Sequence, residues 1–256
     1  MFAEERQEKI FELICREQSV RVTELSKLFD TSVVTIRRDL DVLQQQNKVL
    51  RTHGGAILPY SVGKAIQAQD LMTRNVAEKQ QIARIAYTRI ADDDTILLDS
   101  SSTVFELCRL LLPQKKKRLR IITTSLQAIQ LLSDCEDYSL MIVGGEFNRF
   151  HQTVEGYSAN RFIGEIRVDK CFIGINGIDE SFGFSTPRYE DAEIKSRMIA
   201  SSVESYILAD HTKVGMVYLT SVDASNYLIT DRRVANFEYD AIDEDLTVIF
   251  AEGDGE

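Results

Sequence analysis

The N-terminal part of the chain is best approached through residues 32–43, which read SVVTIRRDLDVL. Apolar residues recur in this stretch at helical spacing, at Val33, Ile36, Leu40 and Leu43. Ser32 stands directly before the pattern, where a side-chain oxygen caps a helix well. The pattern therefore predicts a helix that begins after Ser32 and buries one face.

Two further helices are predicted upstream of this one. The first has Arg6 near its start and carries an apolar stripe at Ile10, Leu13 and Ile14. The second is short and carries its stripe at Leu25, Leu28 and Phe29. Thr23 is its expected N-cap. A longer helix followed by two short helices joined by a tight turn is typical of a helix-turn-helix.

The polar face of the third helix carries two adjacent arginines. Arg37 and Arg38 lie off the apolar stripe, near the N-terminal end of this helix. The N-terminal residues of a recognition helix contact base edges in the major groove. An alternative interpretation is a solvated helix in which Asp39 and Asp41 pair with these arginines. Charge alone favours the alternative, because pairs of neighbouring arginines are common.

The segment after this helix changes that balance. Residues 47–56 read NKVLRTHGGA, which indicates a short strand, a basic pair and a glycine turn. Such a hairpin after a helix-turn-helix is typical of a winged helix. Arg51 and His53 are then expected on the wing, beside the DNA backbone or the minor groove.

The hexapeptides TIRRDL at 35–40 and RTHGGA at 51–56 together closely resemble the DNA-binding signature of the DeoR family of bacterial transcription regulators. The resemblance implies that a double-stranded DNA operator is the partner of this domain. The expected DNA contacts combine hydroxyls, which suit phosphate oxygens and base edges, with cations: Ser32, Thr35, Arg37, Arg38, Arg51 and His53.

The chain is expected to divide into residues 1–58, a linker over 59–75, and a second domain over 76–256. The linker has no clear period and contains Pro59 and Gly63. Beyond it, short apolar runs alternate with helical patterns, which predicts an α/β domain with a mainly parallel, Rossmann-like sheet. The runs expected as strands are 95–99, 119–123, 139–143, 171–175, 206–210, 227–230 and 246–250.

Small and polar residues follow five of these runs, where the carboxyl ends of parallel strands form a ligand crevice. The sharpest example is Asp99-Ser100-Ser101-Ser102-Thr103, which precedes a helix over 105–112 and suits a phosphate ester at that helix N-terminus. A simple N-cap and turn explains the same loop. Lys195, on a helix expected over 191–203, borders an apolar stripe, where lysines usually snorkel to solvent.

The second domain is also similar, in order along the chain, to the effector domain of the DeoR family. The resemblance rests on 78–79, 99–103, 144–145, 169–177, 183–195, 210–215 and 230–231. That domain is related to sugar-phosphate isomerases and senses phosphorylated sugars or related metabolites. The effector contacts that the resemblance implies are Asp99, Ser100, Ser101, Ser102, Thr103, Thr124, Ser125, Gly144, Gly145, Lys195, Asp210 and Lys213.

Three positions depart from the family pattern. Ser101 stands where the family usually has Gly, Val104 where it has a second Thr, and Thr124 where it prefers Asn. A Cβ at position 101 restricts the approach of backbone N–H groups to a phosphate or, alternatively, adds a hydroxyl donor. The departures leave the sugar unspecified.

Composition excludes several classes of protein. The 256 residues are 44% hydrophobic and 27% charged, as in a globular protein, and carry a net charge of −10. Residues 1–58 are neutral overall, so the acidity lies in the second domain. The four cysteines are scattered, which fits a reducing cytoplasm and predicts no metal site or cofactor. No stretch predicts a membrane span or a secretory signal.

The sequence thus predicts a DNA-binding regulator, a repressor of a carbohydrate operon, whose DNA affinity a phosphorylated sugar modulates. It is expected to act as a homo-oligomer on paired half-sites and not as an enzyme. The alternative is an isomerase-like enzyme with an appended DNA-binding module, using acid and base groups among Asp99, Glu190, Asp191, Lys195 and Asp210. A third possibility is a protein–protein adaptor built on a winged helix.

Overall fold

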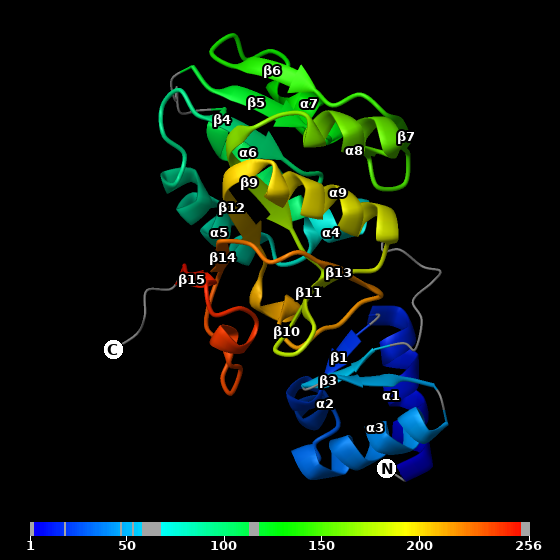
Figure 1. Cartoon of the computed structure of the whole chain (residues 1–256). Helices are drawn as coiled ribbons and strands as arrows, with labels where there is room; N and C mark the ends of the chain where they lie inside the picture. The colour runs from blue at the N-terminus through cyan, green and yellow to red at the C-terminus, as the bar shows by residue number, and fades with distance from the viewer. Residues whose placement is uncertain are drawn as a thin grey trace.

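The computed structural model describes residues 3–17, 19–46, 48–52, 54–57, 68–112 and 118–251. The N-terminal part contains three helices, α1 (Ala3–Glu17), α2 (Val22–Leu28) and α3 (Val33–Gln45). A three-stranded antiparallel sheet in the order β1-β3-β2 completes it, formed by β1 (Ser19–Arg21), β2 (Leu50–Thr52) and β3 (Gly55–Ile57). This arrangement confirms the predicted winged helix-turn-helix, which lies below the rest of the chain in Figure 1.

The helices of this domain bury the stripes that the sequence predicts. Ile10, Ile36, Leu40 and Leu43 share one small core. Ser32 is the N-cap of α3, and its Oγ accepts a hydrogen bond from the Thr35 backbone N–H at 3.1 Å, as predicted. The N-cap expected at Thr23 is wrong.

The second helix instead begins at Val22, directly after β1, and its N-cap Arg21 makes no side-chain cap. Val22 is buried in the core, and its backbone N–H donates to the Gly54 carbonyl at 2.9 Å. The Gly54 carbonyl of the wing therefore accepts from a free N–H at the start of α2, a role that the side chain of an N-cap residue fills in many helices. The wing also needs Gly55, because a Cβ there stands 1.9 Å from the Val20 carbonyl oxygen.

The second domain is built on a seven-stranded parallel sheet in the order β15-β14-β12-β9-β4-β5-β6. Its strands are β4 (Thr95–Leu98), β5 (Arg120–Thr123), β6 (Ser139–Ile142), β9 (Val168–Gly174), β12 (Ser202–Leu208), β14 (Tyr227–Thr230) and β15 (Thr247–Phe250). All seven predicted strands are confirmed. The two strands β9 and β12 begin earlier than predicted, because their first residues are too polar to read as apolar runs.

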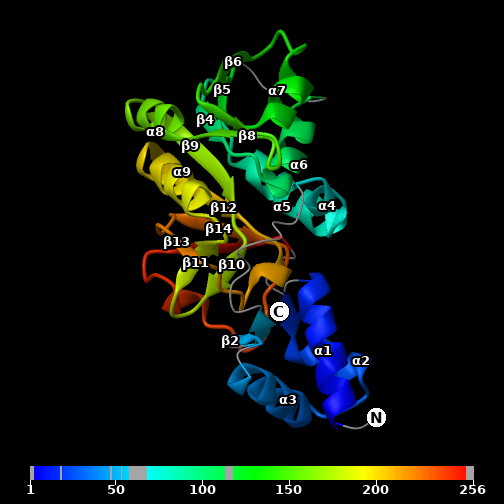
Figure 2. The same ribbon diagram turned by 90° about the vertical axis from the view of Figure 1, so that its right-hand side faces the viewer.

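Helices cover both faces of this sheet, as Figure 2 shows. One face packs against α5 (Val76–Thr88), α6 (Ser102–Leu111) and α7 (Leu126–Leu132). The other packs against α8 (Tyr157–Gly164) and α9 (Tyr189–Ala200). Alternation along β4 serves both layers, since Ile96 and Leu98 join the first core and Leu97 the second.

The predicted extent of the last helix needs correction. A helix was expected over 191–203, but α9 ends at Ala200, and Ser202 and Val203 already belong to β12. Ser201 at the turn is buried, and its hydroxyl donates to the Ile163 carbonyl at 2.7 Å. This tertiary contact ends the helix where periodicity alone continues it.

Several short elements were not predicted, and most lie at the carboxyl end of the sheet. A hairpin joins β7 (Glu146–Asn148) and β8 (Thr153–Glu155), and a second small sheet has the order β10-β11-β13. Its strands are β10 (Gly177–Asp179), β11 (Gly183–Thr186) and β13 (Thr220–Val222). The short helix α4 (Ala68–Thr73) lies within the expected linker. The missed strands mix polar, glycine and apolar residues, as in EFN for β7 and GFST for β11, so they do not stand out as apolar runs.

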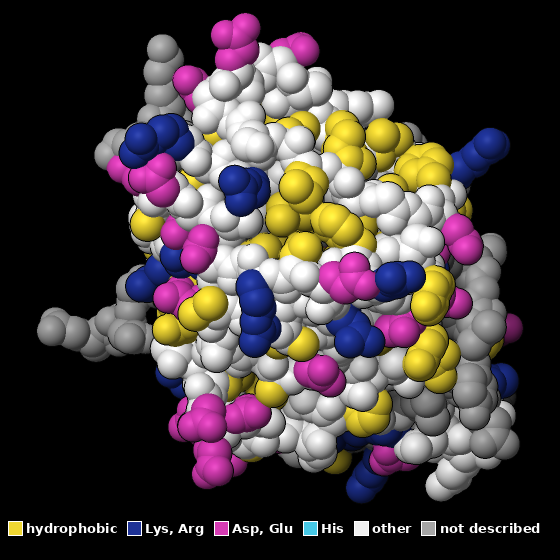
Figure 3. Space-filling model, turned by 45° about the horizontal axis from the view of Figure 1, so that its top comes forward, with side chains coloured by type: hydrophobic (Ala, Val, Ile, Leu, Met, Phe, Trp, Pro, Cys, Tyr) yellow, Lys and Arg dark blue, Asp and Glu magenta, His cyan; other side chains and the backbone are white. Residues whose placement is uncertain are grey.

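The sheet has a free edge at β6. Large apolar side chains are exposed on this strand and on the neighbouring hairpin, at Met141, Ile142, Phe147 and Phe150. Hydrophobic side chains gather on this face of the molecule in Figure 3. Strands of a parallel sheet normally have both faces covered, whereas β6 leaves apolar side chains exposed, and we call this side of the sheet the open edge.

Within the described residues, none of the helices combines the length and the apolar character needed to cross a bilayer. The same residues contain no group of three or more His, Cys, Asp and Glu side chains placed to hold a metal ion. Cys108 and Cys171 are buried free thiols whose pKa burial raises to about 12. Both act as small hydrophobic residues of the core.

Candidate functional site

The first candidate site is the exposed face of α3. Arg37 and Arg38 are both exposed, and among the described residues neither has a hydrogen-bond or ion-pair partner. The hydroxyls of Ser32 and Thr35 lie 2.9 Å apart at the start of the same helix. Two free guanidinium groups and two hydroxyls thus share the first two turns of α3.

The alternative in which Asp39 and Asp41 neutralise these arginines is wrong. Asp39 is only 3% exposed and accepts hydrogen bonds from Arg6 on α1, with Nε at 2.6 Å and Nη2 at 3.2 Å. Asp41 pairs with Arg51 on the wing at 3.2 Å. Both carboxylates therefore hold the domain together.

The wing contributes less free charge than the sequence implies. Arg51 is half-buried, and its guanidinium lies between the Asp41 carboxylate and the Gly55 carbonyl, which is 3.5 Å from Nη1. Its contact with DNA stays a prediction. His53, the other predicted wing contact, lies outside the described residues.

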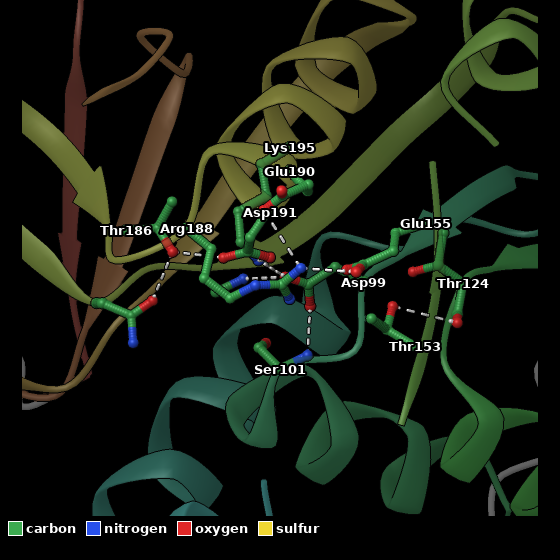
Figure 4. A network of polar contacts seen from close by, with 12 residues as sticks. Asp99, Ser101, Thr124, Thr153, Glu155, Thr186, Arg188, Glu190, Asp191 and Lys195 are labelled. Atoms are coloured by element: carbon green, nitrogen blue, oxygen red, sulfur yellow. Dashed lines mark hydrogen bonds and ion pairs between the residues drawn. The ribbon is translucent and has the colours of Figure 1, made fainter. Parts of the chain in front are cut away.

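The second candidate site lies at the carboxyl end of the parallel sheet, where Asp99 follows β4. Asp99 is 4% exposed and accepts three hydrogen bonds. The donors are the backbone N–H groups of Ser101 and Gly174, both at 2.8 Å, and the Lys195 ammonium at 2.6 Å. Figure 4 shows Asp99 and Ser101, at the end of β4 and the start of α6, facing Lys195 of α9. Asp99 thus joins the hydroxyl loop to the opposite helix layer.

Lys195 is the only cation in contact with Asp99 among the described residues. Its side chain is buried rather than extended to solvent, so the expected snorkelling is wrong. Its Nζ lies between Asp99 and Asp191, the latter at 3.3 Å. Burial lowers the pKa of this ammonium, but the charges of Asp191 and Asp99 outweigh burial and raise the pKa above its ordinary value. Lys195 is therefore charged at neutral pH.

The network continues outward along the start of α9. The Thr186 hydroxyl lies 2.5 Å from the Asp191 carboxylate and 3.0 Å from the Asn176 side-chain oxygen. Arg188 donates to Glu155 of β8 at 2.6 Å and lies 3.4 Å from Glu190. This arm brings the hairpin β7–β8 and helix α9 together over the ends of the strands.

Sequence reasoning did not single out Glu155, Arg188 or His151 as part of this arm. His151 is half-buried, and burial, with the charge of Arg188 second, lowers its pKa. No local signal marks Glu155, because its partner Arg188 is far along the chain. Arg188 lies in the run 183–195 that resembles the family, so that resemblance was the available signal.

The hydroxyl loop caps a helix and is also the predicted site for an anion. The Ser101 side chain caps α6 by accepting from the Val104 N–H at 3.3 Å, and Ser125 caps α7 by accepting from the Ala128 N–H at 3.2 Å. Ser100 and Ser102 are half-buried, and Thr103 is buried. The N-cap interpretation and the anion-site interpretation therefore apply to the same residues.

The departure from the family pattern at position 101 causes no backbone strain, since Ser101 is in an extended conformation with φ −71°. Its Cβ packs on Gly174, where an added Cβ stands 2.3 Å away. Thr124 is buried, and its carbonyl accepts from the Val154 N–H at 2.8 Å. Gly144 and Gly145 are exposed at the end of β6, and a Cβ at 145 stands 2.7 Å from the Glu155 carbonyl oxygen.

The predicted contacts Asp210 and Lys213 form a separate cluster after β12, on the far side of β9 from Asp99. Asp210 is fully buried, and its Oδ1 accepts from the Asn75 amide at 3.2 Å and from the Thr212 N–H at 3.0 Å. Its Oδ2 has no hydrogen-bond partner within the described part of the chain. A buried carboxylate oxygen without a hydrogen-bond partner costs free energy, which makes this atom a candidate acceptor for a ligand donor.

A buried lysine that sequence reasoning did not assign to the site stands beside this cluster. Lys79 donates to the backbone carbonyls of Leu71 at 2.5 Å and Arg74 at 2.7 Å. Burial, and second the charge of Lys213, lowers the pKa of Lys79 to about 8. The end of the sheet thus holds two polar clusters, one centred on Asp99 and Lys195 and one on Asp210, with cations next to each.

Comparison with known proteins matches both parts of the chain. Residues 6–62 match the family described as the DeoR-like helix-turn-helix domain, and residues 74–232 match the DeoR C-terminal sensor domain. The transcriptional regulator GolR of Listeria innocua is 33% identical over 91% of this chain and 92% of its own length. The transcriptional repressor GlcR of Bacillus subtilis is 33% identical over 91% of this chain and 90% of its own length.

The glycerol-3-phosphate regulon repressor of Escherichia coli is 32% identical over 89% of this chain and 90% of its own. Among solved structures, the ribose 5-phosphate isomerase A of Methanocaldococcus jannaschii aligns over 55% of both chains. Its sequence identity is 19% and the TM-score 0.39, a likeness too weak to bear on function.

Proposed function

The chain belongs to the DeoR family of DNA-binding transcriptional regulators, and we propose that it represses a carbohydrate operon until a phosphorylated sugar binds its sensor domain. The observation that carries this proposal is the pairing of two sites in one chain. One is a recognition helix with free arginines, and the other is a buried polar network at the carboxyl end of a parallel sheet.

The operator contacts are Ser32, Thr35, Arg37, Arg38, Arg51 and His53. Arg37 and Arg38 supply the strongest of these, because their charges are not neutralised inside the protein and Arg donates bidentately to guanine and to phosphate. Pairing of the two nearby carboxylates with Arg6 and Arg51 keeps this face positive. The acidic second domain adds no attraction for DNA, so binding depends on this small face.

The effector contacts are Asp99, the hydroxyls of Ser100 to Thr103, Thr124, Ser125, Gly144, Gly145, Lys195, Asp210 and Lys213. Buried carboxylates accept hydrogen bonds from sugar hydroxyls, and Asp210 Oδ2 has an acceptor position open. The phosphate is best held at the N-terminus of α6, where the helix dipole favours an anion, while Lys213 supplies positive charge to the Asp210 cluster. We add Asp191, Arg188 and Lys79 to this set, since they complete the two clusters.

An enzyme is the weaker alternative. Lys195 is charged and held by two carboxylates, so it has no free electron pair with which to act as a base. The matching curated proteins are named as regulators. We propose that the polar network recognises a ligand and does not catalyse a reaction.

We further propose that the protein acts as a homo-oligomer in the bacterial cytoplasm, where the operator DNA is. Helix-turn-helix proteins gain affinity by binding two half-sites, which needs a two-fold arrangement of copies. The open edge at β6, with its exposed apolar side chains, supports a second copy of this chain as the occupant of that edge.

The effector half of the proposal is tested by a thermal-shift screen with glucose 6-phosphate, fructose 6-phosphate, ribose 5-phosphate and glycerol 3-phosphate. A ligand stabilises by RT ln(1 + [L]/Kd), so a binder raises Tm and a non-binder leaves it unchanged. NMR of the same mixtures distinguishes binding from turnover. A product signal that depends on Lys195 contradicts the non-enzymatic assignment.

The DNA half is tested with duplexes selected by the wild-type protein from a random pool. Selection of a shared sequence supports an operator-binding regulator, whereas recovery of random sequences at low salt refutes sequence specificity. Addition of the ligand found by thermal shift then shows whether it weakens the complex, as repression relieved by an effector requires.

A further inference from the structure

The loop of residues 210–215 belongs to both parts of the molecule. It leaves the carboxyl end of β12 inside the sensor domain and reaches the first strand and the wing of the DNA-binding domain. Within the described part of the chain, both of its ends are held by specific hydrogen bonds. The loop thus links the sensor site to the DNA-binding domain through a short chain of contacts.

On the sensor side, this loop supplies two predicted effector contacts. Asp210 caps the short helical turn His211–Lys213 by accepting from the Thr212 N–H at 3.0 Å. The same carboxylate accepts from Asn75, at the start of α5. Lys213 contributes its charge to the surroundings of Lys79. A ligand that uses the open Oδ2 of Asp210 alters the hydrogen bonds that shape this turn.

On the DNA-binding side, Arg21 of β1 holds the same loop. Its Nη2 donates to the carbonyls of His211 and Val214, the second at 3.0 Å. The wing approaches too, since the Gly54 nitrogen lies 3.8 Å from where a Cβ on Gly215 stands. Arg21 pairs with Gly55 of the wing in the sheet register and directly precedes α2.

Further hydrogen bonds hold the loop between these ends. The Asp231 carboxylate accepts from the His211 backbone N–H at 2.6 Å and lies 2.7 Å from the His211 ring Nδ1. The Gly215 N–H donates to the Ile178 carbonyl at 2.7 Å. These hydrogen bonds fix the positions of the loop carbonyls relative to Asp210.

We infer that Arg21 is the positioning residue through which occupancy of the sensor site changes the placement of the wing and the recognition helix. The inference rests on the proposed function, because it needs a ligand at Asp210 and an operator at α3. Arg21 touches neither. It transmits, because its two acceptors belong to the loop that carries Asp210 and its own strand pairs with the wing.

The test is a double-mutant cycle that needs no ligand. Arg21→Ala, Asp210→Asn and the double variant are compared for affinity to a duplex that the wild-type protein selects from a random pool. Asp210→Asn is expected to change that affinity at least fivefold in the wild-type background and less than twofold in the Arg21→Ala background. Additive effects within twofold overturn the inference.

Two further variants separate transmission from charge and from folding. Arg21→Lys keeps a cation and a hydrogen-bond donor. It is expected to retain at least half of the coupling free energy, which is proportional to the logarithm of the affinity ratio in the cycle. Arg118→Ala removes an exposed arginine whose one ion-pair partner among the described residues is Asp93, at 2.9 Å. Its cycle with Asp210→Asn is expected to be additive. If Arg21→Ala does not fold by circular dichroism, Arg21→Gln replaces it with the same expectation.

A ligand readout distinguishes this inference from the proposed function. The member of the sugar-phosphate panel that raises Tm is expected to change duplex affinity in the wild-type protein at least fivefold and in Arg21→Ala less than twofold. An unchanged response in Arg21→Ala overturns the inference and leaves the function intact. A non-additive cycle without any binder in the panel supports the coupling and excludes the four sugar phosphates of the panel as effectors.

Discussion

Replacement of Lys195 by Met tests whether the buried network at the carboxyl end of the sheet is built as described. The ammonium donates to Asp99 at 2.6 Å and lies 3.3 Å from Asp191, and it is 4% exposed. Met fills a similar volume but leaves Asp99 buried without its cation. Removal of one partner from a buried ion pair costs roughly 3–5 kcal/mol. The size of the domain converts this loss into a decrease in Tm of roughly 6–20 °C.

The assay is thermal and urea denaturation of the purified protein at neutral pH, followed by circular dichroism. Arg118→Met is the matched control, because it breaks an ion pair of similar length, 2.9 Å, whose side chains are largely exposed. An exposed pair contributes about 0–1 kcal/mol, so the control is expected to unfold within a few degrees of the wild type.

The double variant Asp99→Asn with Lys195→Met refines the result. It removes the uncompensated carboxylate, so its loss of stability is expected to be smaller than the sum of the single losses by at least about 1 kcal/mol. A loss below about 1 kcal/mol for Lys195→Met alone refutes the reasoning, since an uncompensated buried carboxylate costs more than that.

Three other predictions follow from the same sites. Arg37→Ala and Arg38→Ala should each weaken binding to the selected duplex, measured by fluorescence anisotropy. An arginine that contacts a base should cost about 1–3 kcal/mol and relax the preference at one base pair, whereas one that contacts phosphate should weaken binding to all duplexes alike and reduce the salt dependence. Unchanged binding in both variants refutes the DNA contact. Burial and the charge of Lys213 lower the pKa of Lys79 to about 8, and a bound anion favours the protonated form. Affinity for the phosphorylated ligand is best measured by calorimetry above about pH 7, where the phosphate monoester is already a dianion. It should decrease above about pH 8, and this decrease should be absent in Lys79→Gln; an unchanged pH profile in that variant contradicts the reasoning. Ile142→Glu at the open edge should lower the oligomeric mass in light scattering, whereas Val203→Glu, equally apolar and exposed elsewhere, should not; equal masses for both variants exclude the β6 edge as the contact between copies.

Much of the fold is predictable from local pattern. The seven parallel strands are apolar runs long enough to stand out, and the helices of the DNA-binding domain show clear stripes with a good N-cap at Ser32. The errors lie where a tertiary contact replaces a local signal. The wing carbonyl of Gly54 caps α2 in place of Thr23, and the buried Ser201 ends α9 before the periodicity does.

The residues of the candidate sites divide in the same way. Residue types that follow strands are visible in the sequence, which is why Asp99, Asp210 and the hydroxyl loop were found. Partners are not visible, because they lie far apart along the chain. Lys195 reads as a snorkelling residue until Asp99, 96 residues away, is seen to hold it, and Asp39 reads as a partner of its neighbours until Arg6 is seen to take it.

Local order thus came from the chain itself: which segments are helical or extended, and which family the motifs resemble. Charge pairing came from packing in three dimensions, since an ion pair depends on distance and burial and not on order along the chain. For this reason the freedom of Arg37 and Arg38, the protonation of Lys195 and the hold of Arg21 on the 210–215 loop emerge only in the folded molecule.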